Sequence, residues 1–166
     1  MGIIVRKGKP GLLNREANRE RGIMSDRHSL LIANETFYRN INERNLAQMN
    51  AMWARGRPVA CVHPGWEPLL TREAVMESWQ RILAGPLAPR IKCRRPQALF
   101  LDKFRGKVLG KVAMVVCLEE IAGRFLAATN VFVNVRRSDW RMVHHQAGPI
   151  GQAPPDEARD APTALH

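Results

Sequence analysis

The order of helix-like and strand-like segments predicts an α+β fold, in which three N-terminal helices close a cone-shaped, curved and mostly antiparallel sheet. In the first half of the chain the apolar residues recur mainly at helical spacing, with one short strand-like run between the second and third helical segments. The second half is a run of strand-like segments separated by turns. Helices segregated to one side of an antiparallel sheet make an α+β arrangement.

Three helices are expected before residue 86. The first begins at the Ser25-Asp26 pair and continues to about residue 44, the second begins at Asn45, and the third begins at Thr71. Side chains of these types accept hydrogen bonds from the free N–H groups of a first helical turn. The third helix ends at Gly85, because glycine followed by proline terminates helices.

Five strands are predicted, over residues 59–63, 91–101, 108–118, 125–135 and 140–146. Pro96 cannot donate to a strand ladder, so the second strand is expected at an edge or with a bulge. Residues 108–118 are almost continuously apolar, which is typical of a strand covered on both faces. The last two strands flank a short polar turn and form a hairpin.

The chain of 166 residues is long enough for one domain with tails. Residues 1–24 are basic and rich in glycine, which predicts a loose, disordered arm. The folded domain is expected over residues 25–149. Residues 150–166 are rich in proline, alanine and charge, and we expect them to form a disordered tail.

The formal net charge is +11, with the basic residues dispersed along the chain. A diffuse positive field attracts anions but does not define a partner. Aromatic residues are not interleaved with the basic ones, as they would be on a nucleic-acid platform. We therefore favour a solvated basic surface over nucleic acid as a partner.

Cofactor and membrane signals are missing from the sequence. The three cysteines lie far apart in apolar runs, which predicts buried free thiols in a reducing cytoplasm. The chain shows no long apolar N-terminal segment, so we do not expect a membrane span. We expect a cytoplasmic location. We also expect no cofactor and no metal, because phosphate-binding glycine motifs and metal-ligand spacings are absent.

His63 and Asn130 are the first candidate site residues. His63 ends a strand just before Pro64, and a histidine there can act as a general base or simply order the loop. Asn130 lies in the middle of a strand, where a buried amide without a hydrogen bond costs about 1–3 kcal/mol. Its amide could donate to a ligand oxygen or bond a neighbouring side chain.

The adjacent histidines His144 and His145 must face opposite sides of their strand. By strict alternation His144 shares a face with Trp140 and Met142, and His145 takes the other face. We predict that His145 faces the cavity.

Indole rings at Trp66 and Trp79 suit a site for a flat or apolar ligand, although the helical spacing of Trp79 is equally that of a core residue. The expected ligand is a small apolar or cyclic molecule. The residues predicted to line its pocket are Trp66, Trp79, Phe37, Phe132, Cys61 and Met114.

Three segments carry a resemblance to a known family: FYRNINERNLAQMNAMW (37–53), CVHPGWEPLLTREAVMESW (61–79) and LAATNVFV…WRMVHHQAGP (126–149). Together they make residues 25–149 resemble the nuclear-transport-factor-2-like (NTF2-like) superfamily, in particular its SnoaL-like members. The resemblance implies a cystatin-like α+β barrel, a ligand pocket, and a homodimer formed through the outer sheet face. Relatives include steroid delta-isomerase, scytalone dehydratase, polyketide cyclases and non-catalytic binding modules.

The resemblance also implies roles for particular residues. His63, followed by proline, stands where steroid delta-isomerase-like members carry a general-base aspartate, and Asn130 stands near their mid-sheet hydrogen-bond donor. Phe37 takes the place of their helix-one tyrosine, and we expect Tyr38 on another face of that helix. The ligand-binding arginines of the hub-domain relatives are replaced here by Asn130 and Ala147.

The leading hypothesis is a small-molecule pocket protein of the SnoaL-like type, acting as an isomerase or lyase of the steroid delta-isomerase or polyketide cyclase kind. His63 would abstract a proton next to a carbonyl, with Asn130 and His145 as catalytic residues that stabilise the oxyanion. The alternative is a non-catalytic ligand-binding or dimerisation module. A third hypothesis is weak nucleic-acid binding through the basic arm.

Overall fold

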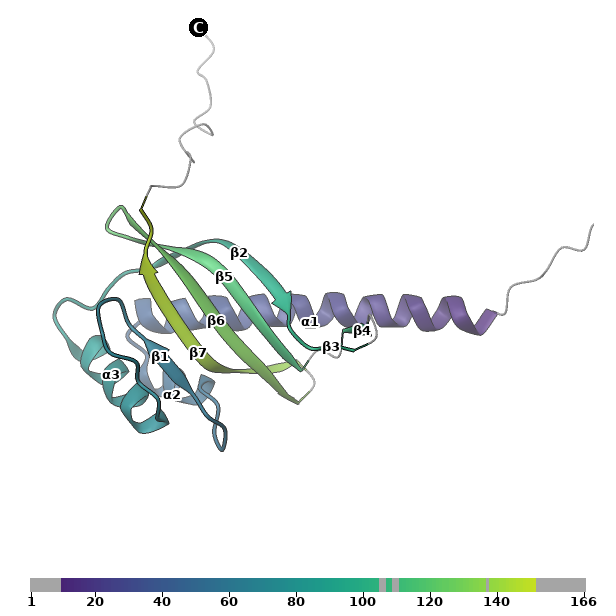
Figure 1. Ribbon diagram of the computed structural model, residues 1–166, viewed down its shortest axis with the longest axis horizontal. Coiled ribbons are helices and arrows are strands. Elements are labelled where there is room, and N and C mark those ends of the chain that lie inside the picture. Colours follow the sequence, from purple (N-terminus) through teal and green to yellow (C-terminus); the bar gives the residue numbers. More distant parts are fainter. Residues whose placement is uncertain (1–9, 105–106, 109–110, 137, 152–166) are drawn as a thin grey trace, which may run out of the picture.

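The computed structural model describes residues 10–104, 107–108, 111–136 and 138–151 (Figure 1). Its helices are α1 (Pro10–Asn42), α2 (Leu46–Met52) and α3 (Arg72–Ala84). The strands, in chain order, are β1 (Ala60–Val62), β2 (Lys92–Phe100), β3 (Lys103–Phe104), β4 (Lys107–Val108), β5 (Val112–Ile121), β6 (Arg124–Arg136) and β7 (Asp139–Pro149).

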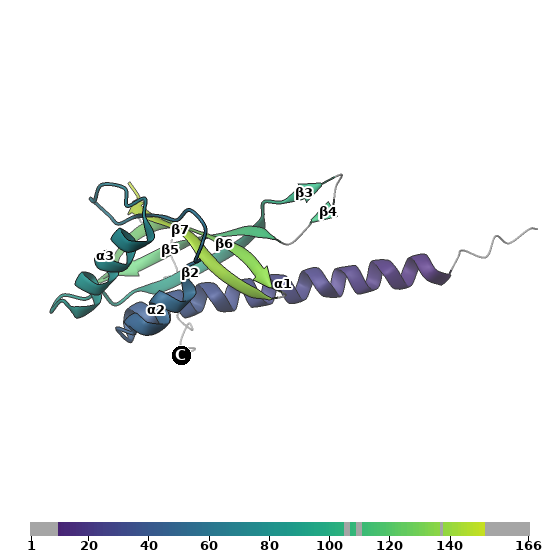
Figure 2. The same ribbon diagram turned by 90° about the horizontal axis from the view of Figure 1, so that it is seen from below.

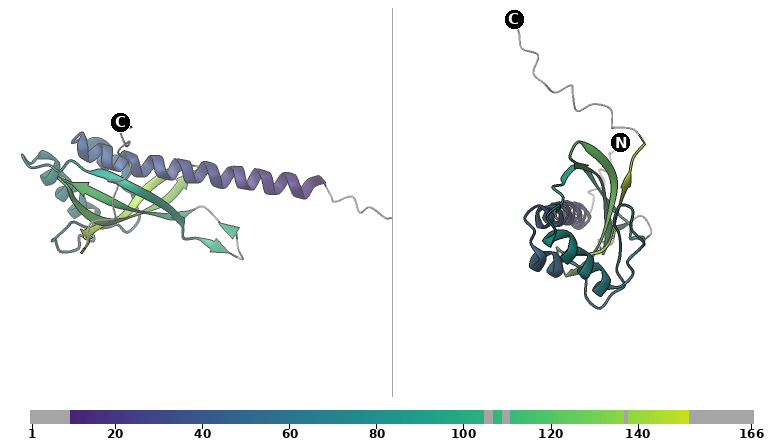
Figure 3. Two further views of the ribbon diagram at one scale, coloured as in Figure 1. Left: turned by 90° about the horizontal axis from the view of Figure 1, so that it is seen from above. Right: turned by 90° about the vertical axis from the view of Figure 1, so that its left-hand side faces the viewer.

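Five strands form one sheet in the order β1-β7-β6-β5-β2, and β3 pairs with β4 in a separate ribbon. Strand β1 runs parallel to β7, and the other neighbours are antiparallel. The sheet curls, and the three helices lie along one of its faces (Figures 1 and 3). The predicted α+β class is confirmed, although β1 and β2 remain separate edges, so the sheet does not close into a barrel.

Helix α1 begins at Pro10 rather than at the Ser25-Asp26 pair, so residues 10–24 are helical and do not form the predicted loose arm. Proline is tolerated in a first helical turn, where its missing N–H has no helical partner. Most residues that follow are good helix formers, and the interior Gly22 costs only about 1 kcal/mol. This N-terminal part of α1 projects beyond the sheet (Figure 2). Residues 1–9 and 152–166, on which the rest of the arm and most of the tail were predicted, lie outside the described residues.

The predicted starts of the second and third helices and the predicted end of the third are confirmed. The Asn45 side chain accepts from the Gln48 N–H at 3.0 Å, and the Thr71 hydroxyl accepts from the Ala74 N–H at 3.2 Å. Helix α3 ends at Gly85, whose N–H donates to the Arg81 carbonyl at 3.1 Å. These contacts satisfy backbone groups that a helix leaves free at its ends.

Strand β2 lies at the sheet edge, and its register with β5 shifts between Arg94 and Gln97, around Pro96. Both features were expected from the proline. Strand β5 differs from its prediction, because only alternate side chains are fully buried, among them Ala113 and Val115. The prediction of a strand covered on both faces is therefore wrong; the helices cover one face only (Figure 3).

The β6–β7 hairpin contains a bulge that the sequence pattern did not predict. Val131 pairs with His144 but Phe132 pairs with Met142, which leaves Val143 as the extra residue. A bulge shifts the alternation of side chains by one position. Met142 and His145 are consequently both buried on the inner face, whereas strict alternation placed them on opposite faces.

The hydrophobic core lies between the helices and the inner face of the sheet. Its largest fully buried side chains come from the helices, the segment after α2, and the hairpin, and they include Phe37, Met49, Trp53, Phe132 and Met142. Aromatic and methionine side chains thus fill the curl of the sheet, except at the end where β1 meets α3.

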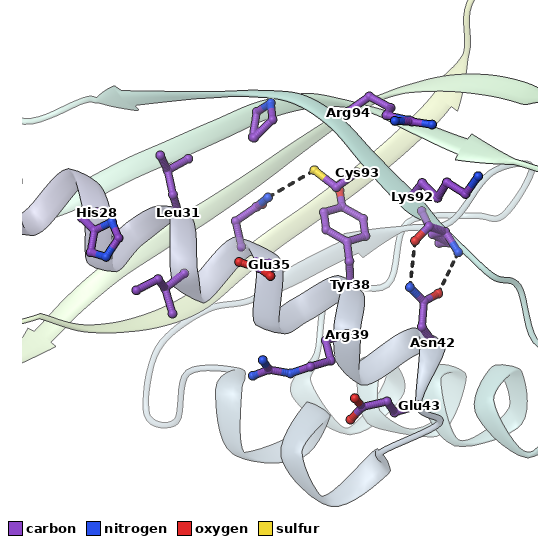
Figure 4. Close-up of a pocket in the computed structure, with 14 residues that line it drawn as sticks. His28, Leu31, Glu35, Tyr38, Arg39, Asn42, Glu43, Lys92, Cys93 and Arg94 are labelled. Atoms are coloured by element: carbon purple, nitrogen blue, oxygen red, sulfur yellow. Dashed lines mark hydrogen bonds between the residues drawn. The ribbon is translucent and has the colours of Figure 1, made fainter.

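Asn42 joins the end of α1 to the start of β2, and this contact gives a test of the fold. Its side chain donates to the Ile91 carbonyl at 2.8 Å and accepts from the Ile91 N–H at 2.7 Å (Figure 4). We expect Asn42→Ala to lower the free energy of unfolding by about 1–3 kcal/mol, because two backbone groups lose their partners. Urea unfolding measures this loss. The exposed neighbour variant Glu43→Ala should change it by less than about 0.5 kcal/mol; equal losses would show that the bridge contributes nothing.

Candidate functional site

A cavity of about 420 Å³ lies at the end of the sheet where β1 and β7 meet α3. Pockets that hold small organic molecules usually enclose about 300–1,000 Å³. Its lining combines aliphatic residues and prolines with six side chains that bear aromatic or polar groups: His63, Trp66, Trp79, Arg81, Glu119 and His145.

His63 follows β1 and is buried. Its Nε2 atom lies 2.8 Å from the Ser78 hydroxyl of α3, and that hydroxyl donates to the Val75 carbonyl at 2.7 Å. Because the serine has one hydrogen and a carbonyl only accepts, His63 Nε2 is the donor, and Nδ1 keeps the lone pair. Burial, aided by the charge of Arg81, lowers the pKa of His63 to about 4. His63 is therefore a neutral imidazole at physiological pH.

His145 lies on β7, with Nδ1 2.7 Å from the Asn130 side-chain oxygen. The Asn130 amide nitrogen donates to the Asn34 side-chain oxygen at 2.8 Å and to the Tyr38 hydroxyl at 3.0 Å, so its oxygen is the acceptor. His145 therefore carries its proton on Nδ1 and its lone pair on Nε2. Burial, and secondarily the nearby histidines, lowers the pKa of His145 to about 3.

Glu119 supplies a carboxyl group to the cavity, and it is not among the predicted site residues. It lies on the inner face of β5, 1% exposed, and accepts a hydrogen bond from the Tyr38 hydroxyl at 2.9 Å. Burial raises the pKa of Glu119 to about 7, against the opposing effect of that hydrogen bond. Burial also raises the pKa of Tyr38 far above its ordinary value, so the phenol stays protonated. Strand alternation could have identified Glu119, because every second residue of β5 from Ala113 and Val115 onward faces the same side of the sheet.

Tyr38 and Asn130 bond to each other inside the protein. Tyr38 lies on a different face of α1 from Phe37, as expected, because it lines the groove beside β2, and it is buried and bonded to both Asn130 and Glu119. Asn130 was expected to offer its amide to a ligand. Both of its amide hydrogens are engaged inside the protein, and it does not line the cavity. Asn130 instead holds His145 in position.

Of the predicted pocket walls, Trp66 and Trp79 line the cavity. Phe37 lies behind them, with its ring centroid 5.5 Å from Trp79 and 4.8 Å from His145. Phe132 is a fully buried core residue and does not line the cavity.

Cys61 and Met114 also differ from the predicted lining. Cys61 lies behind His63, its sulfur 3.7 Å from Nε2, and burial raises its pKa to about 12, so it remains a thiol. All three cysteines are free, as predicted, although Cys93 is only half-buried. Met114 lies on the outer face of the sheet, because its neighbours Ala113 and Val115 take the inner positions.

The cavity mouth is formed by Trp66, which is 39% exposed, and Arg81. The guanidinium carbon of Arg81 lies 5.2 Å from the centre of the Trp66 ring. The same ring meets the His63 imidazole edge-on, with centroids 5.1 Å apart. The opening is therefore cationic and aromatic, whereas the floor holds neutral histidines and a weak acid.

A larger groove of about 760 Å³ runs between α1 and β2, where His28, Leu31 and Tyr38 face Lys92 and Cys93 (Figure 4). It holds one exposed histidine and mostly solvated charges. Tyr38 separates the two hollows, since it lines the groove and bonds to Glu119 of the cavity. We assign the functional site to the smaller cavity, because the buried ionisable groups converge there.

Among the described residues no group of three or more His, Cys, Asp or Glu side chains is placed to hold a metal ion. Nor does the described part of the chain contain a helix that is long and apolar enough to cross a membrane.

Residues 31–150 match the sequence model of the SnoaL-like domain. The chain belongs to this family. No curated protein matches this SnoaL-like chain. Solved structures described as NTF2-like or as having a cystatin-like fold share its fold.

Three solved structures illustrate the likeness. A protein from Streptomyces avermitilis, named a putative dehydratase from the NTF2-like family, is 24% identical, with a TM-score of 0.64 over 76% of this chain and 97% of that one. A putative calcium/calmodulin-dependent protein kinase type II association domain from Thiobacillus denitrificans is 29% identical, with a TM-score of 0.53 over 71% and 92%. A putative scytalone dehydratase from Novosphingobium aromaticivorans is 9% identical, with a TM-score of 0.62 over 81% and 99%.

The raised pKa of Glu119 predicts a pH-dependent stability. Between the ordinary carboxyl pKa of 4.5 and about 7 the unfolded chain loses this proton first, so the Glu119 contribution to stability falls as pH rises. Glu119→Gln should therefore gain stability over the wild type between about pH 5 and pH 8, on the order of 2 kcal/mol. Thermal unfolding across this range measures the difference.

Glu120→Gln on the outer face is the matched control. The hydrogen bond from Arg94 lowers the pKa of Glu120, so its contribution is constant over this range. If the stability differences of Glu119→Gln and Glu120→Gln from the wild type changed with pH in parallel, the effect of burial on Glu119 would be contradicted.

Proposed function

We propose that this SnoaL-like domain binds a small cyclic molecule and moves a proton next to a carbonyl group, as an isomerase or a lyase. The observation that carries the proposal is the convergence, on one cavity, of two neutral histidines and a carboxyl with a pKa of about 7. Groups whose pKa values are pushed in opposite directions by one environment are suited to acid and base roles in the same reaction.

His63 is the proposed base. Its Nδ1 lone pair is unprotonated throughout the physiological range, and the hydrogen bond from Nε2 to Ser78 fixes the ring. A base with a pKa near 4 is weak, so the substrate carbon must be activated by a carbonyl or a second electron-withdrawing group. β-Dicarbonyl compounds and cyclic enones meet this requirement.

The donor to the carbonyl oxygen is Glu119 in its acid form, in place of the expected Asn130 and His145. Asn130 has no free amide hydrogen, and His145 presents a lone pair to the cavity. A buried carboxylic acid can donate one hydrogen bond to a developing oxyanion. His145 Nε2 is then placed to accept a hydrogen bond from a substrate hydroxyl.

Dehydration is one form of this chemistry, because loss of water from a β-hydroxy carbonyl compound starts with the same proton abstraction. Two structures similar in fold are named as putative dehydratases. The alternative is a binding module that holds the same ligand without turnover. The lowered basicity of both histidines would favour this alternative.

Solvent deuterium exchange tests the proposed base. Cyclic β-diketones and enones incubated with the protein in D₂O are expected to incorporate deuterium faster than with buffer alone, and His63→Gln should lower the enzymatic rate about 100-fold or more. NMR follows the exchange. His144→Gln is the control, because His144 is half-buried on the outer face and should leave the rate unchanged. Undiminished exchange in His63→Gln would exclude this base, and binding without any exchange would favour the module.

We further propose that the domain forms a homodimer through the outer face of its sheet. The three helices leave this face of the sheet uncovered (Figure 3), and a row of apolar side chains lies on it. Met114, Val116 and Leu118 of β5 are only half-buried, and Leu99 of β2 is 46% exposed. Apolar surface of this kind is stabilised by a second copy.

Val116→Lys tests the dimer. We expect the wild type to sediment as a dimer and the variant as a monomer, because a charge would be buried against an apolar partner surface. Analytical ultracentrifugation at about 10–100 µM gives the mass. Glu77→Lys on the exposed side of α3 should stay dimeric; a monomeric wild type, or a dimeric Val116→Lys, would contradict the proposal.

A further inference from the structure

We propose that the ligand of this cavity is a planar cyclic carboxylic acid, whose carboxylate is held by Arg81 at the mouth while its ring enters between Trp66 and Trp79. Which end of the ligand reacts rests on the proton transfer proposed above. The anion site itself stands on the geometry of Arg81 and the two indoles.

Arg81 lies in the last turn of α3, lines the cavity and is exposed at its opening. Stacking on Trp66 orders the guanidinium while leaving the N–H groups at its edge free. This planar fork matches the two oxygens of a carboxylate. Such an orientation prepares the side chain for an anion that enters along the Trp66 ring.

No carboxylate among the described residues forms an ion pair with Arg81. Other arginines of the same domain do have such partners: Arg94 lies 2.7 Å from Glu120, and Arg141 lies 2.9 Å from Asp139. An arginine fixed at a cavity mouth without an acidic partner leaves its charge available to a ligand. The dispersed positive charge of the chain would favour the approach of an anion.

Trp79 supplies a second, independent observation. Its indole is 2% exposed and lines the cavity, and its Nε1–H has no hydrogen-bond partner among the described atoms. A buried donor without a partner costs about 1–3 kcal/mol, which a polar substituent of a bound ligand would offset. The surrounding lining is aliphatic, from Ile82, Leu87 and Ile121, and suits a flat ring.

The distances order the ligand along the cavity. The Trp66 ring contacts both groups: the guanidinium carbon of Arg81 lies 5.2 Å from its centre, and the imidazole centroid of His63 lies 5.1 Å from it. A ligand whose carboxylate is held by Arg81 therefore has its ring beside the indole that also contacts the proposed base. The opposite orientation would bury the ligand carboxylate beside the Glu119 carboxyl, which is 1% exposed, in a desolvated space that disfavours charge. We therefore place the carboxylate of the ligand at the mouth and its ring inside the cavity.

Calorimetric titration with 2-naphthoate and 2-naphthamide tests the anion site, because the two probes share a ring system and differ in charge. We expect 2-naphthoate to bind about tenfold or more tightly to the wild type. Arg81→Gln should abolish this preference by weakening 2-naphthoate alone, and Arg81→Lys should restore it in part, since lysine keeps the charge without the fork. Arg57→Gln removes the same charge from an exposed position outside the cavity and should leave both affinities unchanged.

Equal affinities of the two probes for the wild type, or no binding of either at millimolar concentration, would overturn the carboxylate site. Equal weakening of both probes by Arg81→Gln would also overturn it, because Arg81 would then act only by packing on Trp66. These outcomes do not depend on turnover. A failure of the proton-transfer proposal, seen as unchanged exchange in His63→Gln, is therefore distinguishable from a failure of the anion site.

Discussion

The site depends on one chain of buried hydrogen bonds that crosses the inner face of the sheet. It runs from Glu119 on β5 through Tyr38 on α1 and Asn130 on β6 to His145 on β7, with heavy-atom distances of 2.7–3.0 Å. Because Asn130 donates both of its amide hydrogens, its oxygen must accept from His145, and Tyr38, which accepts from Asn130, donates to Glu119. Buried polar networks of this kind are stabilising only when every member is satisfied, because each lost partner costs about 1–3 kcal/mol.

The same desolvation acts in opposite directions on the groups that end this network. It disfavours charge, so the pKa of His145 falls to about 3 and the pKa of Glu119 rises to about 7. His63 is not part of this hydrogen-bond network and bonds to Ser78 instead, but burial also lowers its pKa, to about 4. The apolar walls thus produce two proton acceptors and one weak acid without an ion pair between them.

Much of this arrangement follows from local sequence rules, and the parts that do not have identifiable causes. The caps Asn45 and Thr71, the Pro96 irregularity and the final hairpin are local signals, and all are present. The bulge at Val143 is set by pairing with β6, which alternation along one strand does not reveal. The partners of Tyr38 and Glu119 come from elements far apart in the chain, so their contact depends on how α1 lies on the sheet.

Helix α3 explains why acid–base groups and a cationic mouth occur together. Within one turn it carries Ser78, which fixes His63, then Trp79 of the cavity wall, then Arg81 at the opening. Ser78 and Arg81 are three residues apart and lie on neighbouring positions of one helical face. The His63–Ser78 hydrogen bond joins this turn to the end of β1. A rotation of α3 about its axis would therefore displace the partner of the base and the anion-binding fork at once, so the orientation of a ligand and the position of its proposed base are set by the same packing contact.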